Sequence, residues 1–115
     1  MRLIVAGGRE FSDAKMADEK LSHLTQRYNE VEVVCGMARG ADTIGRLWAE
    51  KNAHKVKKFP AEWDIYGKAA GYRRNEAMAE YATHLVAFWD GRSKGTEHII
   101  NLARRKGLKV RVVKY

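Results

Sequence analysis

Short apolar runs alternate with segments of helical period along the chain, and this alternation restricts the possible folds more than any other feature. The apolar runs occupy residues 3–6, 31–35, 56–59, 85–89 and 110–113. Between the first two runs, Ala17, Leu21 and Leu24 recur at helical spacing and share one helix face. Strands that alternate with helices are typical of a parallel sheet. We therefore predict one α/β domain over residues 1–115, with about five parallel strands and helices on both faces.

The runs differ in polarity, and this difference predicts their places in the sheet. Residues 56–59 are mixed in polarity and end at Pro60, which favours an edge strand. Residues 85–89 form the most apolar run, so we expect them at the centre of the sheet. Residues 61–71 show no clean period, and we expect a long loop with at most one helical turn there. A loop of this length in a compact domain usually carries function.

Polar residues that can cap helices predict where the helices begin. We expect Ser12 or Asp13 to begin the first helix, Asp42 or Thr43 the second, and Thr96 the last. The buried stripe of the second helix is expected to comprise Ile44, Leu47 and Trp48.

The charge balance indicates the kind of partner. The chain has 22 Lys and Arg residues against 14 Asp and Glu residues, a formal net charge of +8. A cationic surface favours anionic partners such as nucleotides, nucleic acids or acidic proteins. The single cysteine cannot form an internal disulfide, and no apolar run approaches the ~20 residues of a membrane span. We expect a cytoplasmic homo-oligomer that does not interact with membranes.

Glycine and arginine gather in the segments that follow the first, second and fourth apolar runs. These segments are 7–11, 36–42 and 90–96, and each leads from a predicted strand into a predicted helix. In open parallel sheets, ligands bind beyond the carboxyl ends of the strands. Glycine lets backbone N–H groups approach a ligand, and a helix N-terminus adds partial positive charge. The three loops therefore predict an anion-binding site, although none has the GxxxxGK[ST] or GxGxxG spacing.

Several side chains near these loops suit the same class of ligand. Trp63, in an irregular polar loop, could stack on a base or pack in the core. The four histidines show no metal-ligand spacing, so we expect no metal and no cofactor other than a nucleotide-like ligand. Arginine suits bidentate phosphate binding or simple solvation at the surface, and the arginines concerned are Arg9, Arg39, Arg73, Arg74 and Arg92.

A second basic feature lies near the C-terminus, where residues 104–114 contain no acidic side chain. Its cationic residues are Arg104, Arg105, Lys106, Lys109, Arg111 and Lys114. A solvated, solubilising face is the interpretation that we favour for this segment. The alternative is a patch that binds nucleic acid.

Four ordered motifs, at residues 6–11, 36–42, 63–75 and 87–96, resemble those of a known family. The first two read AGGREF and GMARGAD, and the set is similar to the YspA-like members of the SLOG superfamily. The resemblance implies a Rossmann-like fold that binds a nucleotide-derived anion, such as an ADP-ribose or NAD-like molecule or a ribosyl phosphate. We expect the protein to act as a sensor or a sequestering protein for this ligand.

The superfamily also suggests two alternatives. It contains cytokinin-activating phosphoribohydrolases, whose Gly-Gly-x-Gly-Thr-x-x-Glu motif is represented here by residues 90–98. Glu97 follows Thr96 directly, so it falls on a different helix face from the family's catalytic glutamate. An N-glycosidic phosphoribohydrolase, with Arg74 and Glu97 as candidate catalytic residues, is the first alternative. The second is a protein that binds single-stranded nucleic acid, because the DNA-processing protein A group does so and is similar at residues 73–75.

The glycine-rich loops and the resemblance together give one set of candidate ligand-binding residues. They are Gly7, Gly8, Arg9, Phe11, Gly36, Ala38, Arg39, Gly40, Asp42, Trp63, Arg73, Arg74, Asn75, Trp89, Asp90, Gly91, Ser93, Gly95 and Thr96. Asp90 is a further candidate carboxylate for the hydrolase alternative.

Overall fold

The crossovers of the sheet reverse direction between two adjacent strands, and this reversal decides where a crevice can form. The computed structural model describes residues 1–115 and contains a five-stranded parallel sheet in the order β3-β2-β1-β4-β5. The strands are β1 (Arg2–Gly7), β2 (Glu32–Cys35), β3 (Lys55–Lys58), β4 (His84–Trp89) and β5 (Lys109–Lys114). From β1 the chain crosses towards β2, and from β4 it crosses the opposite way towards β5. The loops after β1 and β4 therefore diverge and leave a crevice at the carboxyl edge of the sheet.

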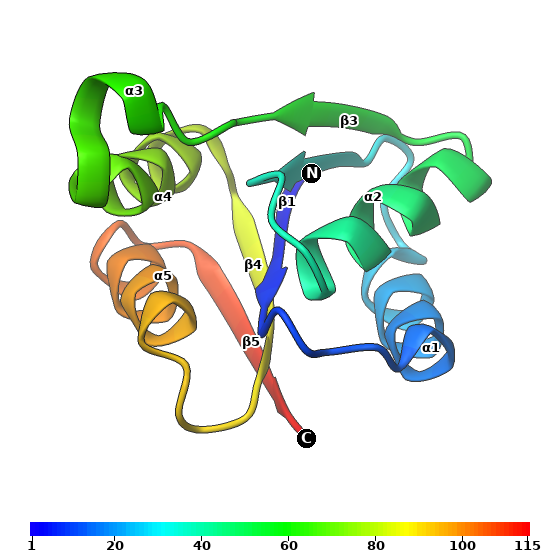
Figure 1. Cartoon of the computed structure of the whole chain (residues 1–115). Coiled ribbons are helices and arrows are strands. Elements are labelled where there is room, and N and C mark those ends of the chain that lie inside the picture. The colour runs from blue at the N-terminus through cyan, green and yellow to red at the C-terminus, as the bar shows by residue number, and fades with distance from the viewer.

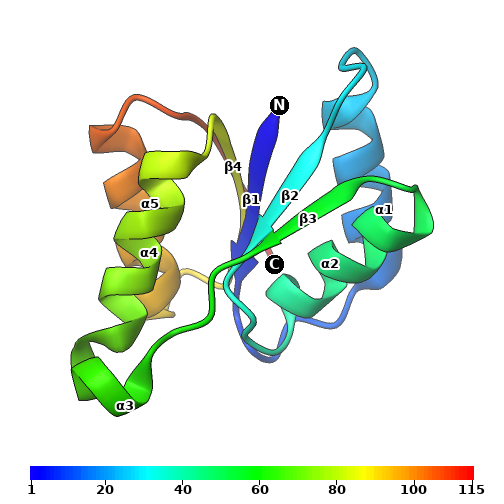
Figure 2. The same ribbon diagram turned by 90° about the horizontal axis from the view of Figure 1, so that it is seen from above.

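Helices cover both faces of the sheet (Figures 1 and 2). One face carries α1 (Ala14–Thr25) and α2 (Ala41–Lys51), and the other carries α4 (Ala70–Tyr81) and α5 (Lys94–Arg105). The short helix α3 (Trp63–Tyr66) and the 3-10 helix η1 (Gly67–Ala69) lead into α4. The predicted fold class, an α/β fold with five parallel strands and helices on both faces, is confirmed. None of the helices combines the length and apolarity needed to cross a lipid bilayer.

Two separate hydrophobic cores explain why the inner strands are continuous apolar runs. Along β1, Leu3 and Val5 pack in the core beneath α1 and α2, whereas Ile4 and Ala6 pack in the core beneath α4 and α5. All four side chains are less than 8% exposed. Successive strand residues point to opposite faces, so a strand that is covered on both faces needs apolar side chains at every position.

The two edge strands are the most polar, and the prediction of an edge strand at residues 56–59 is confirmed by the position of β3. The strand that we expected at the centre, β4, has a partner on each side, but β1 is the middle strand. Both edges carry a row of exposed cationic side chains, namely Lys55, Lys57 and Lys58 on β3 and Lys109, Arg111 and Lys114 on β5.

The helix starts agree with the sequence only in part. Asp13 caps α1 and accepts a hydrogen bond from the backbone N–H of Met16 at 3.0 Å, as predicted. The predicted caps of the second helix are wrong, because α2 begins after Gly40 and contains both Asp42 and Thr43. The last helix begins before Thr96, because Ser93 caps α5.

Two further expectations are corrected by the packing. Leu47 is 52% exposed, because α2 turns Gly45, Trp48 and Ala49 towards the sheet instead. The expected loop at residues 61–71 contains α3, η1 and the first turn of α4. The large apolar side chains of α3 are exposed, with Ile65 at 69%, so no buried stripe marked this helix in the sequence.

Gly45 is the closest approach of α2 to β1, and its replacement tests this packing. A β-carbon there would lie 2.6 Å from Cβ of Val5, a core atom that cannot move away. We expect Gly45→Ala to lower the free energy of unfolding by about 1–3 kcal/mol, as measured by urea denaturation. Gly95→Ala on α5 is the matched control, since a β-carbon there meets no atom within 4 Å. Equal stability of the two variants would contradict the tight packing of α2 on β1.

Candidate functional site

A cavity of about 420 Å³ lies where the loops after β1 and β4 diverge. It brings together predicted residues from the loops after β1, β2 and β4 and from α4, namely Gly7, Gly8, Arg9, Ala38, Asp42, Arg74, Asn75, Asp90, Ser93, Gly95 and Thr96. Five further residues that the sequence reasoning missed complete the wall, namely Ala6, Glu10, Met78, Ile99 and Tyr115. The carboxyl edge of the sheet therefore holds a hollow with both charged and apolar walls.

A second hollow of about 300 Å³ adjoins the cavity. The two share Arg9, Ala38 and Arg74 as a common wall. Three more of the predicted residues line this second hollow, namely Gly36, Arg39 and Trp63. Trp63 is 54% exposed, so its ring is an open surface rather than a core residue.

The remaining predicted ligand-binding residues line neither hollow. Phe11 is 3% exposed, and its ring stacks on Phe88 with the centroids 4.6 Å apart, so it belongs to the core. Trp89 donates a hydrogen bond from its indole nitrogen to the carbonyl of Ser93 at 3.1 Å and packs beside the core. Arg73 lies over the ring of Tyr66 at 4.3 Å on the outer side of α4. Gly40 and Gly91 also lie outside both walls, and Gly40 serves as the start of α2.

Arg74 is the most constrained cation of the cavity. Its Nη1 donates a hydrogen bond to the carbonyl of Gly36, and its Nε donates to Oδ1 of Asn75 at 3.1 Å. A β-carbon at Gly36 would lie 2.7 Å from Nη1 of Arg74 and 2.8 Å from Oδ2 of Asp42. Glycine at position 36, which has no side chain, therefore leaves room for both the guanidinium and the carboxylate beside the chain.

Burial shapes the protonation of this pair. Asp42 is 6% exposed, and burial raises the pKa of its carboxyl, while the charge of Arg74 works in the opposite direction. Burial likewise lowers the pKa of Arg74, and the Asp42 carboxylate opposes that shift. The carboxylate also accepts the backbone N–H of Ala38 at 3.4 Å. Asp42 and Arg74 thus depend on each other for their charged forms.

Hydrogen bonds to the side chains of Asp90 and Ser93 fix the conformation of the loop after β4. Oδ1 of Asp90 accepts hydrogen bonds from the backbone N–H groups of Arg92 at 2.8 Å and Ser93 at 2.9 Å, and these bonds lower the pKa of Asp90. Oγ of Ser93 then accepts the backbone N–H of Thr96 at 3.4 Å. The first turn of α5 is therefore fixed beside the cavity, where helix N–H groups have no intrahelical acceptors.

Tyr115 is the most informative of the residues that the sequence reasoning missed. Its side chain lies against Gly8, its ring centroid is 4.9 Å from that of Phe11, and its backbone N–H donates to the carbonyl of Trp89 at 3.3 Å. Partial burial raises the pKa of its phenol. Because β5 runs beside and parallel to β4, the aromatic residue that follows β5 falls at the same sheet edge as the glycine-rich loops.

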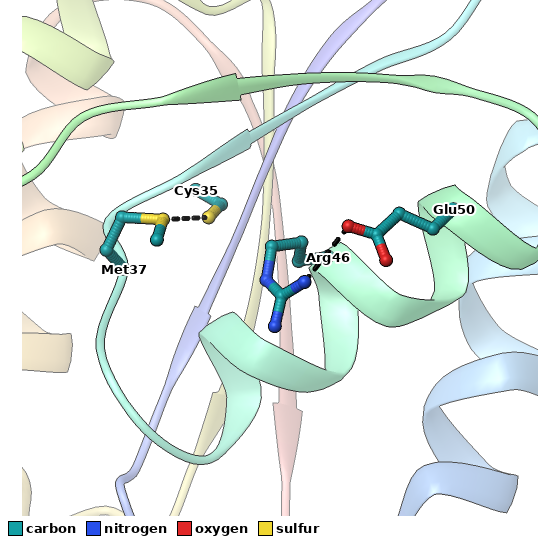
Figure 3. A network of polar contacts seen from close by, with 4 residues as sticks. All are labelled: Cys35, Met37, Arg46 and Glu50. Atoms are coloured by element: carbon teal, nitrogen blue, oxygen red, sulfur yellow. Dashed lines mark hydrogen bonds and ion pairs between the residues drawn. The ribbon is translucent and has the colours of Figure 1, made fainter.

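The segment between β2 and α2 carries a separate set of contacts (Figure 3). Sγ of Cys35 lies 3.6 Å from Sδ of Met37, a residue with a left-handed φ of 64°. One turn into α2, Arg46 and Glu50 form an ion pair at 3.0 Å. Burial raises the pKa of the Cys35 thiol, so this cysteine behaves as a small buried apolar residue rather than a nucleophile. These contacts shape the exit from β2 and do not line the cavity.

The hydrolase alternative needs a carboxylate at the cavity, and only some of the candidate carboxylates lie there. Glu97 is exposed and lines neither hollow, whereas Asp42 and Asp90 line the main cavity. No group of three or more His, Cys, Asp or Glu side chains converges to form a metal site anywhere in the chain.

Two comparisons with known proteins agree with the sequence motifs. The model of the YspA, cpYpsA-related SLOG family matches residues 1–66, which include β1, β2, β3 and α3. The gene 61 protein of Mycobacterium phage D29 is 34% identical to this chain over an alignment of 117 positions. The alignment covers 95% of this chain and 93% of the phage protein. The phage protein therefore matches nearly the whole chain, including the segments that line the cavity.

The mutual dependence of Asp42 and Arg74 predicts a pH-dependent loss of stability. Without the guanidinium, the raised pKa of Asp42 rises further, and above that pKa the fold must hold an uncompensated carboxylate. We expect Arg74→Met to lower the free energy of unfolding by about 1–3 kcal/mol at pH 7. Well below the ordinary aspartate pKa of about 3.9, Asp42 is protonated in the folded and unfolded chains, so the electrostatic part of the loss disappears.

Denaturation of wild type and variant across this pH range measures the effect. Arg39→Met is the matched control, because that arginine side chain is 77% exposed. A loss that is equal at both ends of the pH range would show that Arg74 does not stabilise the Asp42 carboxylate.

Proposed function

The chain belongs to the YspA, cpYpsA-related SLOG family, and on this premise we propose that it binds a nucleotide-derived anion in the cavity beyond β1 and β4. The ligand class is an ADP-ribose or NAD-like molecule, with a ribosyl phosphate as the smaller variant. The protein acts as a sensor or sequestering protein for this ligand. Family membership supports a nucleotide-related ligand, and the geometry of the cavity supports an anion.

One observation carries the proposal: Arg9, Arg74 and the first turn of α5 converge on one hollow at the switch point of a parallel sheet. The guanidinium of arginine can bind two phosphate oxygens at once. The N-terminus of a 12-residue helix contributes partial positive charge and free N–H donors. A phosphate between these groups would meet donors from both loops.

The adjoining hollow favours the larger ligands. Because Arg9 and Arg74 belong to both hollows, a ligand whose phosphates lie at these arginines can extend in both directions. The exposed ring of Trp63 in the second hollow offers a surface on which a base can stack. A nucleotide sugar with a base at one end and a ribose at the other fits this arrangement better than a ribosyl phosphate does.

Binding of single-stranded nucleic acid is a second candidate, and a specific surface favours it. A hollow of about 450 Å³ lies between β3 and α4, and its lining includes Lys57, Lys58, Arg73 and Tyr66 as well as the carboxylates of Glu62 and Glu76. None of its three cations named here forms an ion pair. Unpaired cations beside an exposed aromatic ring suit a phosphate backbone and its bases.

Substitution of Arg74 separates binding from catalysis. We expect Arg74→Ala to weaken ADP-ribose binding by about 1.5–3 kcal/mol in calorimetric titration, the range for a charged hydrogen bond. Glu97→Gln should change the affinity little, because Glu97 is exposed and lies outside the cavity. Circular dichroism of both variants is the control that tests whether they are folded.

Turnover is followed in the same samples by chromatography of AMP and its products. We expect no release of free base from AMP. Brisk release that Glu97→Gln abolishes would replace the binding function with the hydrolase alternative.

The nucleic-acid candidate makes a different prediction. The affinity for a short oligo(dT) should fall steeply with salt, with a slope of about −0.7 per phosphate contacted. Lys57→Ser with Lys58→Ser should weaken it, whereas the Arg104→Ser, Arg105→Ser, Lys106→Ser variant should not, since those residues lie at the end of α5 away from this hollow. Fluorescence anisotropy measures both, and absence of oligonucleotide binding at low salt would eliminate this candidate.

A further inference from the structure

Three side chains form a chain of hydrogen bonds that ends at the cavity arginine. His98 on α5 lies beside α4, where its Nδ1 is 3.1 Å from Nδ2 of Asn75. Oδ1 of Asn75 in turn accepts Nε of Arg74 at 3.1 Å. Asn75 is only 7% exposed, so both ends of its amide are used by protein partners. Figure 2 shows α4 and α5 side by side on the same face of the sheet.

The direction of every bond in this chain is fixed by arginine. A guanidinium can only donate hydrogen bonds, so the atom of Asn75 that faces Nε must be the amide oxygen. The amide nitrogen, which can only donate, then faces His98. Nδ1 of His98 must therefore accept, which requires a neutral imidazole with its proton on Nε2.

We propose that His98 is a positioning residue, which orients Arg74 through Asn75 and releases it when the imidazole is protonated. The inference rests on the proposed function, because it concerns the arginine that binds the anion there. A protonated Nδ1 is a donor and would face the Asn75 amide donor. If the amide rotated to restore that contact, its nitrogen would face Nε of Arg74, again donor against donor. Acidification thus leaves one of these two bonds unmade.

The groups around His98 are few. From α4, the ring of Tyr72 meets the imidazole edge-on with the centroids 4.6 Å apart, and the carboxylate of Glu76 favours protonation. On α5 itself, the guanidinium of Arg105 opposes protonation. Burial is the largest influence and lowers the pKa of His98 below its ordinary value. At pH 7 the neutral imidazole therefore predominates, and the hydrogen-bond chain is intact.

A measurement without ligand tests the positioning directly. The Nε–H resonance of Arg74 is followed by ¹⁵N NMR between about pH 8 and pH 5.5, together with the ring resonances of His98. In the wild type, we expect the Arg74 signal to shift with the titration of His98. In His98→Phe, which keeps a ring against Tyr72 but cannot titrate, the signal should not move over this range. An Arg74 signal that ignores the His98 titration would overturn the inference.

The functional consequence is measured with ADP-ribose as the probe. It is preferred to AMP because a phosphate monoester itself gains a proton near pH 6. Loss of one positioning bond predicts that wild-type affinity falls about three- to tenfold on acidification through the His98 titration. In His98→Phe the affinity should be independent of pH. His84→Gln, at a second partly buried histidine that contacts Tyr28 and Thr83 instead, should keep the wild-type pH profile.

Asn75→Asp supplies the reciprocal test. A carboxylate accepts both from Nε of Arg74 and from a protonated Nδ1 of His98, so affinity should no longer fall on acidification. A wild-type affinity that is measurable but constant with pH would contradict the inference. Absence of ADP-ribose binding at every pH would count against the proposed function, and the NMR titration would then decide the positioning role by itself.

Discussion

The approach of a half-buried guanidinium and a buried carboxylate to the backbone of Gly36 is the interaction on which the site depends. Arg74 comes from α4 and Asp42 from α2, so the pair joins helices that cover opposite faces of the sheet. Each charged group is costly in isolation, because burial favours its neutral form. Together they hold the loop after β2 between them. An anion that binds at Arg74 therefore meets a cation whose position is already determined by the protein.

The backbone and the side chains contribute differently to the cavity. The loops after β1 and β4 follow from the sheet topology, since the crossovers diverge at these two strands. The wall that α4 contributes is made of side chains, among them Arg74 and Asn75. A change in α4 could thus alter the ligand while the sheet and its loops stay the same.

Much of the fold was predictable because strands buried on both faces leave an unmistakable pattern, as in β1 and β4. The parts that failed lack such a pattern. The apolar side chains of α3 are exposed. Leu47, which we expected in a buried stripe, is exposed, and Phe11, which we expected to bind the ligand, is buried, because packing against the sheet decides which side chains become buried. The predicted glycines and Arg74 were found from local motifs. Tyr115 and the Asn75–His98 contact join segments that are distant in sequence, so no local spacing could have revealed them.

The cationic side chains on both edges of the sheet have a consequence for assembly. An uncovered edge strand offers unpaired backbone groups to any similar edge, and two copies of this chain could in principle extend one sheet across the boundary. Here every such pairing, β3 with β3, β5 with β5 or β3 with β5, would bring rows of like charges together. These like charges disfavour growth of the sheet from one molecule into the next.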